Sequence, residues 1–255
     1  MVDIKAIAVD IDGTITDNHR RLCISAMKAI REAEDKGIPT IIVTGNVADF
    51  AYAAEIFIGS SGGIVFENGG GIFKEYENNN ELLIFGDKTE VNRAHEHLIK
   101  ELPDIMVSSD NKFRVAEKCY YKDNVTRNQV AEIVKDYNVT VYDSGFALHI
   151  TDPNVNKGSS LIELLKWLDI SADNVMGIGD SENDIEFLNV CGLKVAVANA
   201  DERLKNIGDY VCKNKYGDGV SEAIYKFVLN NYWYWSLLNF FNSINTRIKF
   251  LKNLF

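Results

Sequence analysis

Short apolar runs alternate with segments of helical spacing along most of the chain. The runs IKAIAVDI (residues 4–11) and TIIVTG (residues 40–45) are almost entirely apolar, which is typical of strands buried on both faces of a parallel sheet. Between them, residues 25–36 place alanine and isoleucine side chains on one side of an amphipathic helix. The same alternation returns after residue 157, with strands predicted at NVMGIGD and LKVAVAN. This order predicts right-handed βαβ units and an α/β fold with a Rossmann-like parallel sheet.

The middle of the chain follows a different pattern. Helical spacing recurs at residues 90–102 and 126–137, but the strand-like segments around them, NKFRVAEKCYY and VTVYDSGFALHIT, mix polar and apolar residues. Such mixing is expected of a sheet with one face in water. We therefore predict an α+β domain at residues 77–151, inserted into a core made of residues 1–76 and 152–227. The polar stretch EYENNNEL is expected to be the first linker.

The C-terminal segment, residues 228–255, differs from the rest in charge. It contains no acidic residue, although the chain has 37 of them. Large apolar residues recur at steps of three or four from Trp233 to Phe255 and predict an amphipathic helical extension. Its apolar stripe is expected to pack on the core or on another copy of the chain. Contact with a membrane surface is the alternative, because aromatic residues favour interfaces and basic residues attract anionic lipid.

Net charge and cysteine content exclude some functions and indicate a cellular compartment. The formal net charge is −10 over 255 residues, which excludes a general nucleic-acid binder with a basic surface. The four cysteines lie far apart without a CxxC motif, so we expect reduced thiols and a cytoplasmic protein. The N-terminal residues carry charges within their apolar stretch, so we predict no signal peptide. No apolar stretch is long enough to predict a membrane-spanning helix.

Polar side chains stand where several predicted strands end. They are Asp10 and Asp12 after the first strand, Thr44, Gly45 and Asn46 after the second, Lys157 at a helix start, and Asp180 and Asp184 after the strand NVMGIGD. Ligands of parallel α/β sheets bind at the carboxyl ends of the strands, so these residues are candidates for one site. A helix N-cap explains a single strand-end aspartate equally well. Together, however, the residues supply complementary chemistry.

The chemistry of these residues suits a hard metal ion and a phosphoryl group. Asp10 and Asp12 point the same way in an extended backbone, and two carboxylates so close require a cation or a shared proton. No histidine or cysteine cluster adjoins them, and carboxylate oxygens favour Mg²⁺. Lys157 and the Thr44 hydroxyl can face phosphoryl oxygens, as can backbone N–H groups at a helix start. The residues therefore predict phosphoryl transfer with a carboxylate nucleophile.

Four motifs in order, DIDGT, TGN, NKG and GDSEND, resemble those of the haloacid dehalogenase (HAD) superfamily. The insertion between the second and third motifs is similar to that of Cof-type members with a C2-type α/β cap. The compact insertion and the TGN motif are most similar to archaeal-type phosphoglycolate phosphatases. The resemblance covers about residues 1–227 and ends before the C-terminal extension.

The resemblance implies a role for each motif residue. Asp10 would attack phosphorus and form an aspartyl-phosphate, and Asp12 would protonate the leaving alkoxide and later deprotonate water. Mg²⁺ would be held by Asp10, the main-chain carbonyl of Asp12, Asp180 and, directly or through water, Asp184. Thr44, Gly45, Asn46 and Lys157 would bind the transferring group.

The motifs favour a Mg²⁺-dependent phosphatase acting on a small phosphorylated metabolite, and the resemblance implies 2-phosphoglycolate as the expected substrate. A sugar-phosphate phosphatase or a phosphomutase is the alternative within the superfamily. A phospho-accepting regulatory module is an alternative of another class, which the acid at Asp12 disfavours. His149 fits an ordinary strand position better than a position lining a cleft, and ENGG at residues 67–70 fits a turn between strands.

Overall fold

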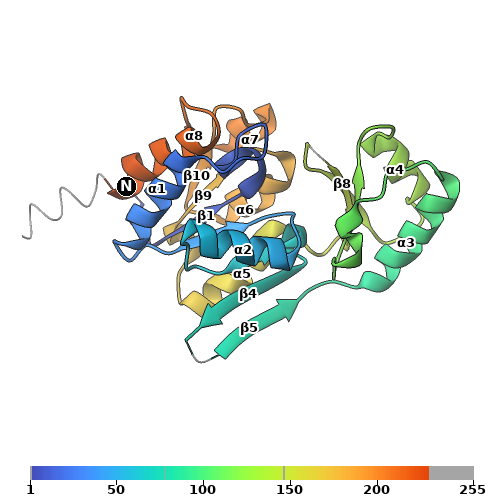
Figure 1. Ribbon diagram of the computed structural model, residues 1–255, viewed down its shortest axis with the longest axis horizontal. Helices are drawn as coiled ribbons and strands as arrows, with labels where there is room; N and C mark the ends of the chain where they lie inside the picture. Colours follow the sequence, from blue (N-terminus) through green and yellow to red (C-terminus); the bar gives the residue numbers. More distant parts are fainter. Residues whose placement is uncertain (1, 78, 146, 230–255) are drawn as a thin grey trace, which may run out of the picture.

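Eight strands form one sheet in the larger of two units of the molecule (Figure 1). The computed structural model describes residues 2–77, 79–145 and 147–229. The strand order is β11-β10-β9-β1-β2-β3-β4-β5, parallel from β11 to β3 and ending in the antiparallel hairpin β4–β5. These strands are β1 (Ala6–Val9), β2 (Thr40–Val43), β3 (Ile64–Phe66), β4 (Gly71–Tyr76), β5 (Asn79–Ile84), β9 (Val175–Gly179), β10 (Leu193–Ala196) and β11 (Tyr210–Val211).

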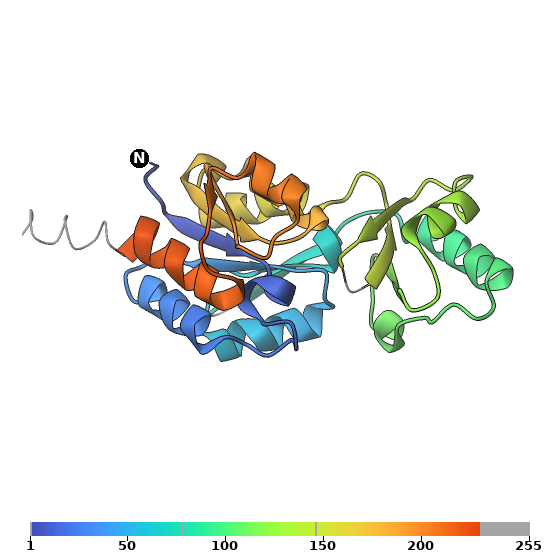
Figure 2. The ribbon, with the colours of Figure 1, turned by 90° about the horizontal axis from the view of Figure 1, so that it is seen from above.

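Helices cover both faces of this sheet. Helices α1, α2 and α8 lie on one face and α5, α6 and α7 on the other (Figure 2). Their bounds are α1 (Ile24–Glu34), α2 (Ala48–Ile58), α5 (Lys157–Leu168), α6 (Ile185–Val190), α7 (Glu202–Ile207) and α8 (Tyr216–Ile224). Short helical turns are η1 (Ile11–Ile15), η2 (Glu67–Gly69), η3 (Ser109–Lys112), η4 (Ala172–Asn174), η5 (Glu182–Asp184) and η6 (Tyr225–Leu229). The central strands β1 and β2 are buried throughout, so the predicted α/β core is confirmed.

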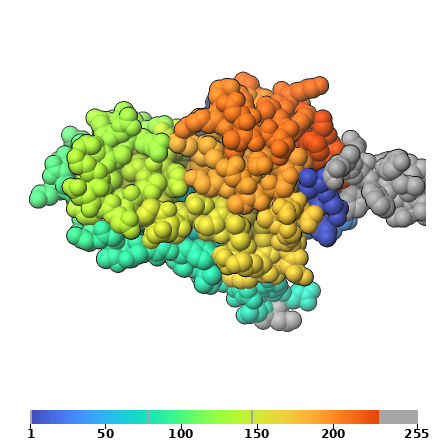
Figure 3. All heavy atoms as spheres, turned by 180° about the vertical axis from the view of Figure 1, so that it is seen from behind, coloured from blue at the N-terminus to red at the C-terminus, as the bar shows by residue number. Residues whose placement is uncertain are grey.

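The smaller unit has its own sheet and its own hydrophobic core. Its antiparallel strands, in the order β6-β8-β7, are β6 (Lys118–Tyr121), β7 (Thr140–Asp143) and β8 (Ala147–Thr151). Helices α3 (Lys88–Glu101) and α4 (Arg127–Ile133) pack on one face of this sheet. The predicted strand NKFRVAEKCYY is shorter than expected, because its first residues form the turn η3. Figure 3 shows this unit, in green, lying directly against the core.

The polar stretch EYENNNEL is not a linker. It contributes to the hairpin of β4 and β5, which extends the core sheet by antiparallel pairing. Strand β5 is exposed at almost every position, so its composition resembles that of a loop. The crossing to the smaller unit comes after Ile84, where the Asp87 N–H donates to the Asp152 carboxylate at 2.8 Å. The boundary at residue 77 is therefore corrected, and we propose residues 85–151 as the inserted domain, called the insert below.

The predicted C-terminal extension reaches beyond the structure. Of residues 228–255, only Val228 and Leu229 are described; both are buried at the end of η6. The apolar stripe, and with it the expected contact with another copy or a membrane surface, lies outside the described residues. Within the described ranges, no helix combines the length and apolar character that crossing a membrane requires.

Candidate active site

The sheet brings three of the four motifs together at the carboxyl ends of its central strands. Asp10 directly follows β1, Thr44 follows β2 and Asp180 follows β9. Because β1 pairs with both β2 and β9, the chain order reverses at β1, and a crevice is expected there. Gly13 turns the backbone away with a φ of 85°, and a Cβ at this position would lie 2.3 Å from an oxygen of Asp180. Only glycine fits both demands.

A cluster of three carboxylates surrounds one buried ammonium group at this edge. Oxygens of Asp10, Asp180 and Asp184 lie within 4.8 Å of one another. Lys157, the first residue of α5, donates to Asp10 at 2.8 Å and to Asp184 at 2.6 Å. The other oxygen of Asp184 accepts the backbone N–H groups of Asp180 and Ser181 at 2.9 and 3.0 Å. Asp184 therefore fixes both the lysine and the loop that carries Asp180.

The cluster has three carboxylates but one ammonium group, and this excess of negative charge suits a divalent cation. Burial raises the pKa of Asp10 to about 7, against the effect of Lys157. Burial and the charge of Asp184 raise the pKa of Asp180 to about 9. Burial alone would lower the pKa of Lys157, but Asp10 and Asp184 outweigh it and hold that pKa above its usual range. Clustered hard carboxylate oxygens with excess negative charge are the donor set that Mg²⁺ takes.

Asp12 has a different environment from Asp10. Its carboxylate is not part of the acidic cluster but accepts from Asn46 Nδ2 at 2.7 Å and Arg20 Nε at 2.8 Å. The Asn46 amide also donates to the Thr44 hydroxyl at 2.9 Å. The second motif therefore orients the Asp12 side chain. Coordination of a metal by the Asp12 main-chain carbonyl stays a prediction.

A cavity of about 210 Å³ lies between the core and the insert, above these residues. It is smaller than the roughly 300 to 1,000 Å³ of pockets for drug-sized ligands and suits a small metabolite. The core lines it with Asp10, Asp12, Arg20, Gly45, Asn46, Ser181 and Asn183, and the insert with Ser108, Ser109, Asp110, Arg114, Cys119, Tyr121, Ser144, Ala147 and His149. Thr44 and Lys157 are buried next to this lining.

The face of the insert sheet that carries both polar and apolar side chains lines the cavity and does not face open water. Cys119 and His149 line the cavity, while the intervening Tyr120, Leu148 and Ile150 belong to the insert core. This is the period of two expected of a strand. His149 therefore lines the cleft, contrary to the simpler expectation, and its Nδ1 lies 2.8 Å from Glu117.

A buried network joins the insert to the core beside the cavity. Both oxygens of Glu67 accept the successive backbone N–H groups of Val115, Ala116 and Glu117 at 2.8–3.1 Å. Asn68 donates to Glu117 at 2.9 Å and accepts from Asn183 at 2.8 Å. Glu67 and Asn68 both have positive φ values, 48° and 53°, which non-glycine residues rarely adopt. Such strain at a site is maintained only when surrounding contacts hold it.

Arg114 extends this network from the insert to the second motif. Its guanidinium donates to the Gly45 carbonyl at 3.0 Å, to Asp110 at 2.8 Å and to Glu117. Burial raises the pKa of Glu117, but His149 and Arg114 outweigh it and lower that pKa. Glu117 is thus an ionised, fully buried anchor between the two units.

Replacing Glu67 by glutamine is expected to loosen the insert. An amide offers one acceptor oxygen, and its NH₂ group would face backbone N–H donors. Losing a charge-assisted hydrogen bond should speed hydrogen exchange at the amides of residues 115–117 by roughly 10- to 100-fold. Exchange mass spectrometry or NMR at these amides measures the effect.

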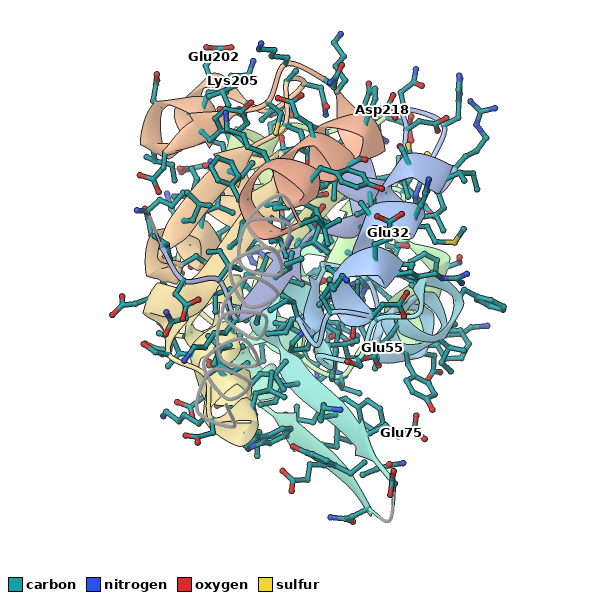
Figure 4. The ribbon with its side chains drawn as sticks, turned by 90° about the vertical axis from the view of Figure 1, so that its left-hand side faces the viewer. Glu32, Glu55, Glu75, Glu202, Lys205 and Asp218 are labelled. Atoms are coloured by element: carbon teal, nitrogen blue, oxygen red, sulfur yellow. The ribbon has the colours of Figure 1, made fainter. Side chains whose placement is uncertain are left out.

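The matched control is Glu55→Gln, another buried glutamate in the core. Glu55 belongs to α2 and is seen from the end of the core opposite the insert (Figure 4). Its Oε1 accepts the Gly63 N–H at 2.8 Å, a bond that glutamine can keep. Equal exchange at residues 115–117 in wild type and Glu67→Gln would show that Glu67 does not hold the insert.

Sequence reasoning missed Arg20, Glu67, Asn68, Arg114 and Glu117. Glu67 and Asn68 directly follow the apolar strand IVF, which is the same strand-end signal that identified Asp10. They form the predicted turn between β3 and β4, but the sequence did not indicate that their side chains bond to the insert. Arg114 and Glu117 lie in a mixed segment where no local pattern indicates burial.

Comparisons with known proteins agree with this geometry. The sequence pattern of the haloacid dehalogenase-like hydrolases matches residues 7–144 and, in a second match, residues 87–224. A Methanobrevibacter smithii protein named phosphoglycolate phosphatase is 56% identical over 235 residues, covering 89% of this chain and 100% of that protein. One of the same name from Methanothermobacter thermautotrophicus is 48% identical over 224 residues, covering 88% and 99%.

A solved structure extends the likeness to the fold. The crystal structure of Thermoplasma acidophilum 0175 superposes with a TM-score of 0.79 at 28% identity, over 88% of this chain and 97% of that chain. The superfamily and the class of enzyme predicted from the motifs are thus confirmed. The chain belongs to the haloacid dehalogenase-like hydrolase family.

Proposed function

We propose that the chain hydrolyses 2-phosphoglycolate in a Mg²⁺-dependent reaction that passes through an aspartyl-phosphate at Asp10. The observation that carries this proposal is the acidic cluster with Lys157 at the sheet edge where Asp10 lines a small cavity. The names of the two archaeal relatives support the choice of substrate. A small cavity also fits a metabolite whose leaving group has two carbons.

Asp10 is the nucleophile in this proposal. It lines the cavity and is oriented by the bond from Lys157, whose charge offsets the repulsion between a carboxylate and an incoming phosphate dianion. Asp10, Asp180 and the Asp12 carbonyl would hold Mg²⁺, with Asp184 supporting them. When bound, this ion supplies positive charge that stabilises the phosphoryl oxygens.

Thr44, Gly45, Asn46 and Lys157 form the proposed cradle for the transferring group. Gly45 and Asn46 line the cavity, and Thr44 and Lys157 are buried beside it. Hydroxyl, amide and ammonium donors suit the three non-bridging phosphoryl oxygens.

Asp12 acts as the general acid and base. Its carboxylate lines the cavity, two residues from the nucleophile, and Asn46 holds it in place. It protonates the leaving oxygen and then takes a proton from the water that hydrolyses the aspartyl-phosphate. The insert shields the nucleophile, because it supplies the opposite wall of the cavity.

Phosphate release from a panel of monoesters tests the proposal. We expect the highest kcat/KM for 2-phosphoglycolate over sugar phosphates, with activity lost in EDTA and restored by Mg²⁺. A sugar phosphate cleaved with higher kcat/KM would replace the proposed substrate. A single turnover with stable phospho-protein would instead indicate a regulatory module.

A further inference from the structure

Arg20 stands on a short turn beside the cavity, outside the four motifs. The turn lies between Thr16 and Leu22, which form an isolated antiparallel bridge. The Arg20 N–H donates to the Asp17 carbonyl at 2.9 Å, and the φ of Arg20 is 59°. Glycine or asparagine adopts this left-handed conformation more readily than arginine. Backbone strain of this kind occurs preferentially at ligand-binding and active sites.

The turn is fixed by Asp17 and aims the Arg20 side chain at the site. The Asp17 carboxylate accepts the backbone N–H groups of His19 and Arg21 at 2.9 and 3.0 Å, and the Arg21 guanidinium at 2.6 and 2.8 Å. With the backbone so held, the Arg20 guanidinium contacts Asp12 at 2.8 Å and Asn46 at 3.5 Å.

Arg20 is the accessible cation of the cavity. Among the described residues that line it, the other basic side chains are Arg114 and His149. Arg114 is only 4% exposed and His149 is equally buried, and both are bonded to Glu117. The Arg20 side chain is 56% exposed, and within the described part of the chain it forms an ion pair only with Asp12. A second anionic group of a substrate would therefore meet Arg20.

Arg20 lies near the point where the carboxylate of the proposed substrate is expected. Asp12 is assigned to the leaving oxygen, and Arg20 is bonded to Asp12. In 2-phosphoglycolate a single methylene group separates that oxygen from the carboxylate carbon. A planar guanidinium can bind a carboxylate through two parallel hydrogen bonds.

We propose that Arg20 determines specificity by binding the substrate carboxylate beside Asp12. This inference rests on the proposed function and adds the residue that distinguishes a phosphorylated carboxylic acid from a neutral phosphomonoester. Binding needs only a rotation of the exposed side chain, since the backbone turn stays in place.

The test compares 2-phosphoglycolate with ethyl phosphate, which has the same carbon chain without the carboxylate. For Arg20→Gln we expect the ratio of the two kcat/KM values to fall roughly 10- to 100-fold, the loss expected for a charge-assisted hydrogen bond. Arg20→Lys should recover part of the ratio. Arg93→Gln removes the same charge from an exposed position on α3, outside the cavity lining and away from the turn of Arg20, and should leave the ratio unchanged.

Each outcome separates this inference from the proposed function. If wild type prefers 2-phosphoglycolate and Arg20→Gln keeps that preference, the role of Arg20 is overturned. An equal loss on both substrates also overturns it, because Arg20 would then act only through Asp12. If the wild-type protein shows no preference for 2-phosphoglycolate, the proposed substrate itself is wrong. This result comes from the wild-type protein alone, without the variants.

Discussion

Asp10→Asn is expected to reduce turnover of 2-phosphoglycolate by roughly 10⁴-fold or more, while the protein stays folded. The substitution removes the attacking carboxylate and one proposed metal ligand together. An asparagine Oδ1 can still accept from Lys157, so the buried contact at 2.8 Å has a substitute. Removing one charge also relieves repulsion with Asp184 and Asp180, so the Tm should be equal to that of wild type or higher. Phosphate release and thermal unfolding followed by circular dichroism measure the two effects.

A matched control for this variant is Asp35→Asn, at an exposed position after α1. It makes the same chemical change outside the site and should keep wild-type kcat. Substantial turnover in a folded Asp10→Asn protein would show that another group attacks phosphorus. A sharp loss of Tm would instead assign Asp10 a structural role alongside Lys157.

The strand-end residues could be predicted from sequence because two local signals coincide there. Asp10, Thr44 and Asp180 each follow a short apolar run, and parallel topology then places such ends at one edge. Lys157 starts a helix, so its direction toward the same edge follows from the βαβ order. Their convergence at one edge of the sheet needed no long-range information beyond the strand order.

The rest of the site depends on contacts that no local pattern shows. Glu67 and the amides of residues 115–117 are about fifty positions apart, and their pairing is decided by how the insert docks. Glu117 is a charged residue in a polar-looking segment, yet it is fully buried because Arg114, His149 and Asn68 surround it. Strand β5 was not predicted because it is an exposed edge strand, and such a strand needs few apolar residues.

The core and the insert contribute different side chains to the site. The core supplies the two carboxylates that we propose to react, Asp10 and Asp12, and the buried Lys157, which lie just after a strand or at the start of a helix. The insert lines the cavity with mostly uncharged side chains, and its charged lining residue Arg114 is bonded to Asp110 and to the core carbonyl of Gly45. Recognition of a second anion therefore depends on the core turn that carries Arg20.

Asp12→Asn is expected to slow hydrolysis of 2-phosphoglycolate by about 10²- to 10⁴-fold, the range for loss of a general acid and base. The alkoxide of glycolate is a poor leaving group and needs a proton as the bond to phosphorus breaks. The p-nitrophenolate ion leaves without one. The first step with p-nitrophenyl phosphate should therefore be affected far less, and phosphorylated enzyme should accumulate because the second step still lacks its base.

Replacing Asp12 can slow the reaction in two ways, by removing the acid or by shifting neighbouring side chains. Both of its partners, Arg20 and Asn46, are donors, so the amide NH₂ of an asparagine would oppose one of them. This mismatch could shift the side chain and slow every substrate by the same factor. Single-turnover phosphorylation rates for the two substrates separate the two causes, because only loss of the acid depends on the leaving group. Equal losses for 2-phosphoglycolate and p-nitrophenyl phosphate would reduce Asp12 to a residue that positions its neighbours.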